Sequence, residues 1–120
     1  MMTILLVEDE LHVHYFIWKL LKADGFTVLT AGDGEAALEK LRKHPNPVDL
    51  VVTDMGLPRL NGFELYRQIL VERPGTKVIL MSGDLAVREQ CEMAGLPFFQ
   101  KPFLDDALQQ VVRAVIGSPR

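Results

Sequence analysis

Short apolar runs alternate with helical apolar patterns five times along this chain of 120 residues, and no other feature limits its fold as strongly. Such short runs are long enough for buried strands and too short for helices. Strict alternation of strand and helix predicts a parallel sheet covered by helices on both faces. We therefore expect one α/β domain over residues 1–120, without an output domain. The predicted strands are 3–7, 26–30, 50–53, 77–81 and 98–100.

Capping and breaking residues delimit the predicted helices. Asp33 can cap the second helix, Gly62 can begin the third, and Pro74-Gly75 ends it. Residues 85–94 predict a short fourth helix. Apolar residues at helical spacing mark the core side of the first and last helices: Val13, Phe16, Ile17, Leu20 and Leu21 in the first, and Leu104, Leu108, Val111, Val112 and Val115 in the last.

The composition argues against several classes of protein. Thirteen Lys and Arg residues against sixteen Asp and Glu residues give a formal net charge of −3, which argues against direct nucleic-acid binding. The only cysteine, Cys91, cannot form an internal disulfide, which favours a reducing compartment. The first predicted strand leaves no room for a signal peptide, and no apolar run approaches the ~20 residues that span a bilayer. We expect a cytoplasmic protein that does not enter the membrane.

Polar side chains follow four of the five predicted strands. Glu8 and Asp9 follow the first strand, Asp54 the third, Ser82 the fourth and Lys101 the fifth. In open parallel sheets, ligands bind beyond the carboxyl ends of the strands, where the strand order reverses. One acidic residue at a strand end is usually a cap or a solvated loop residue. The convergence of all these groups at one edge indicates a functional site.

The three carboxylates at this edge suit a hard divalent cation. Glu8, Asp9 and Asp54 contribute −3 and Lys101 contributes +1, which leaves −2, and one Mg²⁺ cancels that charge. Mg²⁺ commonly uses one or two carboxylates, several waters and a phosphate oxygen. Without the cation, an incoming phosphoryl group would meet unscreened negative charge. The sequence therefore predicts a Mg²⁺ site that handles a phosphoryl group, in which Mn²⁺ or Ca²⁺ could substitute.

These motifs together resemble the receiver domain of two-component response regulators, the CheY-like family. The resemblance covers essentially the whole chain. It is carried by the acidic pair Glu8-Asp9, the stretch 54–62, Ser82 after the fourth strand and the segment 101–103 after the fifth. The resemblance implies a flavodoxin-like, doubly wound three-layer sandwich with the strand order 2-1-3-4-5.

The resemblance also implies a role for each site residue. Asp54 is then the phosphoacceptor that attacks a phosphohistidine. Asp9, Asp54 and the backbone carbonyl of Gly56 ligate Mg²⁺, and Glu8 acts through a bound water. Lys101 pairs with a phosphoryl oxygen, and Ser82 donates a hydrogen bond to another.

Two further features follow from the same resemblance. The Lys101–Pro102 bond is expected to be cis, which X–Pro bonds tolerate at a cost of only ~0.5–1 kcal/mol. Ser82 and Phe98 correspond to the switch pair, in which the aromatic ring swings inward when the hydroxyl moves to the phosphoryl group. Since Phe98 has no hydroxyl, we expect the inward rotamer to be favoured; the alternative is an ordinary core residue.

Two departures from the usual family pattern concern the fourth helix and its approach. Only 19 positions separate Ser82 from Lys101, so we expect the segment 83–94 to be abbreviated or irregular. Asp84, two residues beyond Ser82, adds negative charge near the site, which predicts an effect on phosphoryl lifetime of undetermined sign.

An apolar stripe on the first helix is a candidate partner surface. Leu11, Tyr15 and Trp18 follow helical spacing on the side opposite the predicted core, and receivers dock kinases or phosphotransfer proteins there. The alternative is scattered surface apolar residues, which are normal. His12 and His14 point about 200° apart on a helix and do not form a metal pair.

The predicted function is that of a two-component receiver and not of an enzyme. It accepts a phosphoryl group from a histidine kinase or phosphotransfer protein and signals through contact with a further protein, as a monomer or a weak phosphorylation-dependent dimer. The alternatives are a receiver module from a hybrid kinase or longer regulator, and an Asp-nucleophile phosphatase. The phosphatase chemistry needs a second Asp where Gly56 stands, which argues against it.

Overall fold

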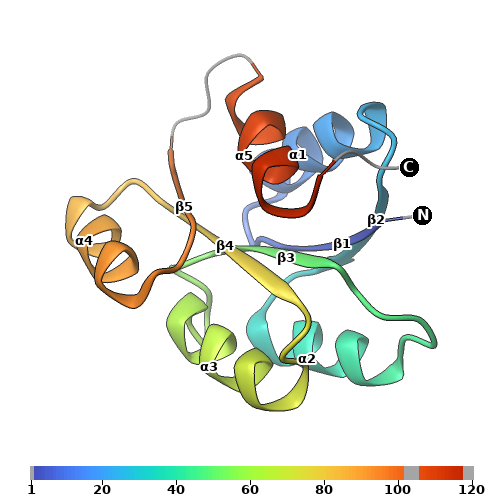
Figure 1. Ribbon diagram of the computed structural model, residues 1–120, viewed down its shortest axis with the longest axis horizontal. Helices are drawn as coiled ribbons and strands as arrows, with labels where there is room; N and C mark the ends of the chain where they lie inside the picture. The colour runs from blue at the N-terminus through green and yellow to red at the C-terminus, as the bar shows by residue number, and fades with distance from the viewer. Residues whose placement is uncertain (1, 102–105, 118–120) are drawn as a thin grey trace.

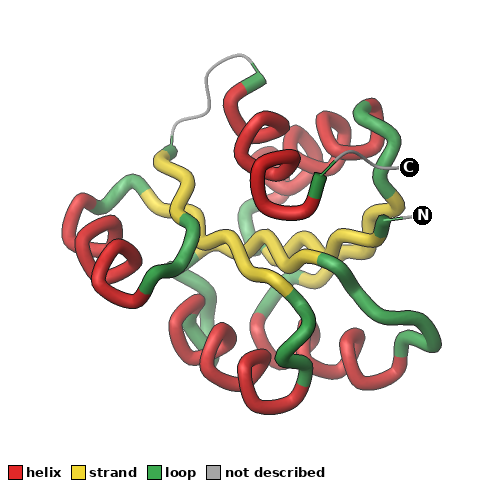
Figure 2. Tube along the Cα trace, in the orientation of Figure 1, coloured by secondary structure: helices red, strands yellow, loops and turns green. Residues whose placement is uncertain are grey.

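A five-stranded parallel sheet forms the middle layer of the computed structural model, which describes residues 2–101 and 106–117 (Figures 1 and 2). The strand order is β2-β1-β3-β4-β5, as predicted. The strands are β1 (Thr3–Val7), β2 (Thr27–Ala31), β3 (Leu50–Asp54), β4 (Lys77–Ser82) and β5 (Phe98–Gln100). The helices are α1 (Leu11–Ala23), α2 (Gly34–Lys43), α3 (Gly62–Glu72), α4 (Leu85–Ala94) and α5 (Ala107–Ile116).

Two apolar cores lie on opposite faces of the sheet. On one face, α1 and α5 pack through residues such as Ile17 and Leu108; on the other, α2, α3 and α4 pack through residues such as Leu38 and Leu65 (Figure 1). The strand β1 shows why both cores form. Its side chains alternate, so Ile4 enters the α1 side and Leu5 the α2 side, and every residue of the strand is buried.

The predicted elements are all present, with small shifts of their ends. The second strand is one residue later than predicted, with Phe26 buried beside it, and β3 and β4 extend to include Asp54 and Ser82. The last helix is described from Ala107 onward, and the predicted core residue Leu104 lies outside the described residues.

The fourth helix has the predicted bounds and is regular, so of the two expectations for the segment 83–94, abbreviated or irregular, the second is wrong. It has ten residues, as many as α2 and α5, and Asp84 caps its first turn. Gly95 ends it in the left-handed conformation that glycine adopts without strain. The connection between β4 and α4 is correspondingly short, because only Gly83 and Asp84 separate the two elements.

The rotation of α1 about its axis differs from the predicted one. Ile17 and Leu21 are buried, but Phe16, predicted in the core, is 47% exposed, and Trp18, predicted on the outer side, packs in part against the core. The physical reason is that Phe16 and Trp18 lie about 100° to either side of Ile17. Trp18 packs against the same core as Val28 of β2.

Among the described residues, the helices are too short or too polar to span a membrane.

Candidate functional site

Backbone hydrogen bonds beyond the strand ends hold the site residues at one edge of the sheet. The Glu8 amide donates to the Ala31 carbonyl at 3.2 Å, and the Met55 amide donates to the Met81 carbonyl at 3.0 Å. The Lys101 amide donates to the Ser82 carbonyl at 3.0 Å. The hydrogen-bond ladder thus continues into the loops, and the residues that follow β1, β3 and β5 have little freedom to move.

An ion-pair network joins three of the predicted site residues. The Lys101 Nζ atom lies 2.8 Å from Glu8 Oε1 and 2.9 Å from Asp54 Oδ1. The Glu8 side chain is only 1% exposed, that of Asp54 is 15% exposed and that of Lys101 is 25% exposed. Partial burial alone would lower the pKa of Lys101, but the hydrogen bonds and charges of Glu8 and Asp54 outweigh burial and raise that pKa above its usual value.

The three predicted metal carboxylates converge on a small volume. Glu8, Asp9 and Asp54 each offer an oxygen, and these oxygens lie within 4.8 Å of one another. Oxygens bound to one octahedral Mg²⁺ lie about 3 Å apart when adjacent and about 4.2 Å apart when opposite, so the three carboxylates are near one another but would move closer to share an ion directly. The donors are hard oxygens, so their chemistry and their charge fit a Mg²⁺ ion.

The two carboxyl oxygens of Asp54 have different partners. Oδ1 faces Lys101, while Oδ2 accepts a hydrogen bond from the Gly56 amide at 3.1 Å. A Cβ atom at Gly56 would lie 3.5 Å from Oδ2, an ordinary contact distance. A side chain at position 56 would therefore touch the Asp54 carboxylate without a clash, and the backbone of Gly56, the predicted carbonyl ligand, lies beside this carboxylate.

Three residues of the predicted motif 54–62 give the loop after β3 its shape: Arg59, Asn61 and Gly62. Arg59 adopts a left-handed conformation with φ of 68°, and Asn61 forms a capping box with Glu64 at the start of α3. A Cβ atom at Gly62 would lie 2.6 Å from Leu80 Cδ1 and 2.9 Å from the Asp54 carbonyl, so only glycine fits without displacement. The spacing of Asn61 and Glu64 is a recognisable capping signal.

Ser82 lies at the site edge and is held by a local turn. Its Oγ accepts the Asp84 amide hydrogen at 3.0 Å, and the Asp84 carboxylate accepts the Ala86 amide hydrogen at 2.9 Å. A hydroxyl that accepts one hydrogen bond can still donate another. Phe98 pairs with Leu80 in the sheet, is partly buried, and packs against the core on the α4 side. Pro102, with its predicted cis bond, lies outside the described residues.

The predicted partner stripe on α1 is in part exposed. Leu11 is 81% exposed and Tyr15 is 61% exposed, and the Tyr15 ring stacks on the Trp18 ring with centroids 6.1 Å apart. These three residues line a hollow of about 490 Å³ that also reaches Glu8 and Asp9. His14 lies in its wall, with Nδ1 2.9 Å from the Glu8 carbonyl oxygen, and so orients the end of β1.

Comparisons with known proteins give one consistent family. A family model described as the response regulator receiver domain matches residues 4–113. The sensor kinase CckA of Brucella abortus is 34% identical over 117 residues, which are 95% of this chain and 12% of that protein. The probable transcriptional regulatory protein TcrX of Mycobacterium tuberculosis is 31% identical over 119 residues, or 95% of this chain and 49% of that protein. The chain thus spans half or less of the length of these relatives.

Two solved structures are similar to nearly the whole chain. A response regulator receiver domain protein from Clostridium thermocellum is 30% identical, with a TM-score of 0.87, over 97% of this chain and 94% of that one. The receiver domain of a sensor histidine kinase from Pseudomonas aeruginosa PAO1 is 30% identical, with a TM-score of 0.85, over 98% of each chain. That second structure has a magnesium ion coordinated in its active site cleft.

Proposed function

The chain belongs to the response regulator receiver domain family of two-component systems, and from this we propose that Asp54 accepts a phosphoryl group with the help of Mg²⁺. The observation that carries the proposal is the convergence at one sheet edge of three carboxylates with the Lys101 ammonium, 2.9 Å from Asp54 Oδ1. Donors of the phosphoryl group would be a histidine kinase or a phosphotransfer protein. The chain then acts as a switch and not as an enzyme with turnover.

The residues that would hold Mg²⁺ are Asp9, Asp54 and the carbonyl of Gly56. Glu8 is already bonded to Lys101, so it would act through a bound water, as its depth in the site also favours. Mn²⁺ or Ca²⁺ could substitute, since both also accept oxygen ligands. When bound, the divalent cation neutralises charge on the transferring phosphoryl group.

The chemistry of Asp54 is a nucleophilic displacement at phosphorus. One carboxylate oxygen forms the new O–P bond as the N–P bond to the donor imidazole breaks, which leaves an acyl phosphate on Asp54. Lys101 starts in contact with Asp54 Oδ1, so its charge is already where the new phosphoryl oxygens arrive. The Gly56 amide holds Oδ2 and limits rotation of the carboxylate.

The proposed output runs through Ser82 and Phe98. The Ser82 hydroxyl would donate its hydrogen to a phosphoryl oxygen, and a movement of Oγ toward that oxygen would lengthen the hydrogen bond that Oγ accepts from the Asp84 amide. Phe98 lies on the adjacent strand β5 and lines a hollow with Arg88 and Glu92 of α4. A change in the packing of Phe98 would therefore alter the surface of α4 and β5, where a downstream protein could bind.

Docking of the phosphoryl donor is proposed at the α1 stripe. Leu11 and Tyr15 expose apolar surface beside the hollow that reaches Asp9. We expect Trp18→Ala to slow phosphotransfer from the kinase more than labelling by acetyl phosphate, because only the kinase needs the docking surface. Leu11→Ala changes a second residue of the same stripe on α1 and should show the same difference between the two reactions. Equal loss of both reactions would indicate damage to the fold and would remove the docking claim.

Two arrangements of the whole protein are proposed for this receiver. It signals either as a separate regulator or as a receiver module of a longer kinase or regulator. CckA and TcrX illustrate the second case, because the matched segment covers 12% and 49% of these proteins.

In both cases we expect the phosphoryl lifetime to depend on Asp84, which stands near the site but is engaged as the cap of α4. Equal dephosphorylation rates for wild type and Asp84→Ala would exclude it.

The decisive test combines Mg²⁺ binding with acid-labile labelling by acetyl phosphate. The wild type should bind Mg²⁺ in titration calorimetry and take up label only when the cation is present. Asp9→Asn should weaken Mg²⁺ binding, and Asp54→Asn should abolish the label. An Asp54→Asn protein that labels like the wild type would overturn the proposal.

A further inference from the structure

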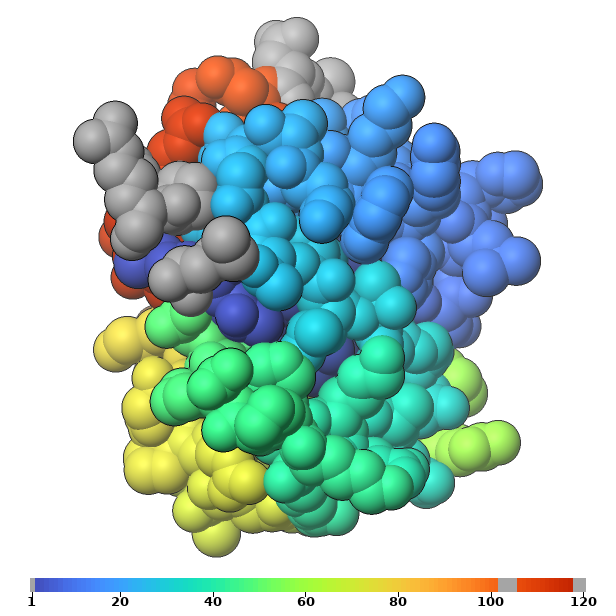
Figure 3. All heavy atoms as spheres, turned by 90° about the vertical axis from the view of Figure 1, so that its right-hand side faces the viewer, coloured from blue at the N-terminus to red at the C-terminus, as the bar shows by residue number. Residues whose placement is uncertain are grey.

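The strand β2 forms one edge of the sheet and has no protective residue of its own. β2 is an edge strand of five residues, Thr27–Ala31, without a charged residue or proline. Natural edge strands are generally guarded by lysines, prolines, bulges or short length. The other edge strand, β5, has only three residues. Figure 3 looks onto the β2 side of the molecule, where this strand reaches the surface between α1 and α2.

The register of β2 shows which backbone groups point outward. The Thr27 amide donates to Met2, and the Ala31 carbonyl accepts from Glu8, so Thr27, Leu29 and Ala31 pair with β1. In a parallel ladder, alternate residues bond to the same neighbour. Val28 and Thr30 therefore direct their amide and carbonyl groups away from β1, toward the open edge. These groups are arranged to pair with an added strand.

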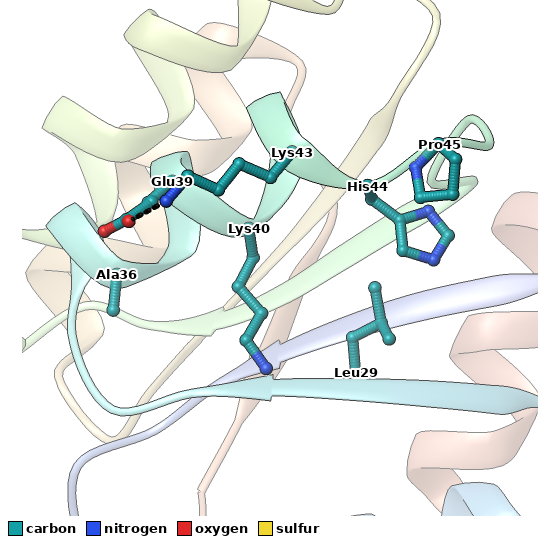
Figure 4. Close-up of a pocket in the computed structure, with 7 residues that line it drawn as sticks. All are labelled: Leu29, Ala36, Glu39, Lys40, Lys43, His44 and Pro45. Atoms are coloured by element: carbon teal, nitrogen blue, oxygen red, sulfur yellow. Dashed lines mark hydrogen bonds and ion pairs between the residues drawn. The ribbon is translucent and has the colours of Figure 1, made fainter.

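A hollow lies beside β2 on each face of the sheet. On the α2 face, a hollow of about 430 Å³ has Leu29 and Ala36 at its base, with Lys40 extending from α2 toward the strand (Figure 4). On the α1 face, the hollow of about 490 Å³ reaches Thr30 and Trp18. Side chains of an extended strand alternate between faces, so successive side chains of an added peptide would enter these two hollows in turn.

The charges around the α2-face hollow select the occupant. Three charged residues line it: Glu39, Lys40 and Lys43. Lys43 is paired with Glu39 at 2.5 Å, so these two charges cancel, whereas Lys40 forms no ion pair with any residue that the structure describes (Figure 4). The protein as a whole carries −3, so this cationic rim is a local feature. Acidic side chains on one face of an added strand would meet Lys40.

A second copy of the chain fits this edge less well. Antiparallel pairing of two β2 strands in one continuous sheet places both α2 helices on the same face. The Lys40 and Lys43 residues of both copies would then come together, and like charges oppose association.

From the open backbone, the paired hollows and the cationic rim, we infer that the β2 edge binds an extended peptide segment of a partner protein, with acidic side chains facing α2 and apolar ones facing α1.

The peptide site shares its α1-face hollow with the surface proposed for docking of the phosphoryl donor, but its test measures peptide binding and needs no phosphoryl transfer to Asp54. The probe is a short fluorescein-labelled peptide of alternating glutamate and valine, and its control is a peptide of alternating lysine and valine. In amide hydrogen exchange followed by NMR, the acidic peptide should slow exchange at Val28 and Thr30 at least about tenfold, because these amides gain a partner. Leu29, already bonded to β1, should change little. Asp54→Asn should bind the peptide as the wild type does.

Variants of the chain test the backbone and the charge separately. Val28→Pro removes an outward amide and keeps the bonds to β1, as proline allows on edge strands, and should abolish peptide binding. Lys40→Glu should weaken binding about tenfold, while Lys77→Glu, an exposed change at the start of β4, should leave it unaltered. Should Val28→Pro fail to fold, the exchange pattern of the wild type still decides the matter.

Three results would overturn the inference. Exchange at Val28 and Thr30 that is unchanged by the acidic peptide excludes strand addition. Equal binding of the lysine peptide excludes the role of the cationic rim. Protection of these amides that grows with protein concentration, in the absence of peptide, assigns the edge to a second copy.

Discussion

Replacing Lys101 by methionine removes the cation that compensates the buried Glu8 carboxylate and keeps most of the aliphatic side chain. Glu8 is 1% exposed and its Oε1 lies 2.8 Å from the ammonium, so the variant leaves an unpaired charge at depth. Breaking a fully buried pair costs about 3–5 kcal/mol, and an exposed pair contributes about 0–1 kcal/mol. Since Lys101 is 25% exposed, water can enter in part, and we expect a loss of about 2–3 kcal/mol.

Urea denaturation followed by circular dichroism measures this loss directly. A loss of 2–3 kcal/mol in a chain of this size corresponds to a fall in Tm of roughly 10 °C. The double variant Glu8→Gln/Lys101→Met removes both charges, so its stability should exceed that of Lys101→Met. Mg²⁺ should stabilise Lys101→Met more than the wild type, because the metal supplies positive charge at the same carboxylates.

The matched control is Lys77→Met at the start of β4, where the lysine is exposed. A surface change of this kind should stay within about 0.5 kcal/mol of the wild type. Equal stability of Lys101→Met and Lys77→Met would refute the electrostatic account of the site. So would strict additivity of the Glu8 and Lys101 changes, since it would mean that the pair contributes no coupling energy.

Three further predictions concern packing, reactivity and pH. Gly62→Ala should lower the free energy of unfolding in urea by about 1–3 kcal/mol, because the added Cβ meets Leu80 at 2.6 Å. Gly75→Ala is the control and should cost far less, because no atom lies within 4 Å of a Cβ at Gly75. Equal losses for the two variants would contradict the close approach at Gly62. Burial raises the pKa of the Cys91 thiol, so a thiol reagent at neutral pH should modify it only in urea, and rapid labelling of the native protein would contradict its burial. The hydrogen bond from Arg42 lowers the pKa of Glu72 in the folded state. The stabilisation that this bond provides is therefore fully present above the pKa of Glu in the unfolded state, about 4.3, and is lost as the pH falls through the lower pKa of the folded state. The stability difference between wild type and Glu72→Gln should therefore be larger at pH 7 than in acid, and a difference independent of pH would refute this.

The alternation of apolar runs was sufficient to predict a parallel sheet covered on both faces, because the strands of such a sheet are mostly apolar. The strand order was implied by the resemblance to receiver domains. The positions of Glu8, Asp9, Asp54 and Lys101 followed from the same reasoning, since residues after parallel strands share one edge. The contact between Lys101 and Glu8 could not be predicted, because it depends on how far two side chains reach across the sheet.

The errors arose where periodicity alone does not determine orientation. One residue of helical rotation, about 100°, separates Phe16 from Ile17, and the spacing placed both on the core side although only Ile17 is buried. The spacing between Ser82 and Lys101 gave the length of this segment, but it did not show how many of its residues form the loop and how many form the helix. In the structure, two residues join β4 to α4, and the helix is regular over ten residues.

The most direct test of the central claim identifies the atom that carries the phosphoryl group. The protein is treated with acetyl phosphate and Mg²⁺, and the product is reduced with borohydride, which converts an acyl phosphate of aspartate to homoserine. Mass spectrometry of the resulting peptides should place homoserine at position 54, and only in samples that contained the cation. Reduction at another carboxylate, or a phosphoryl group that survives acid on a serine, would contradict the account.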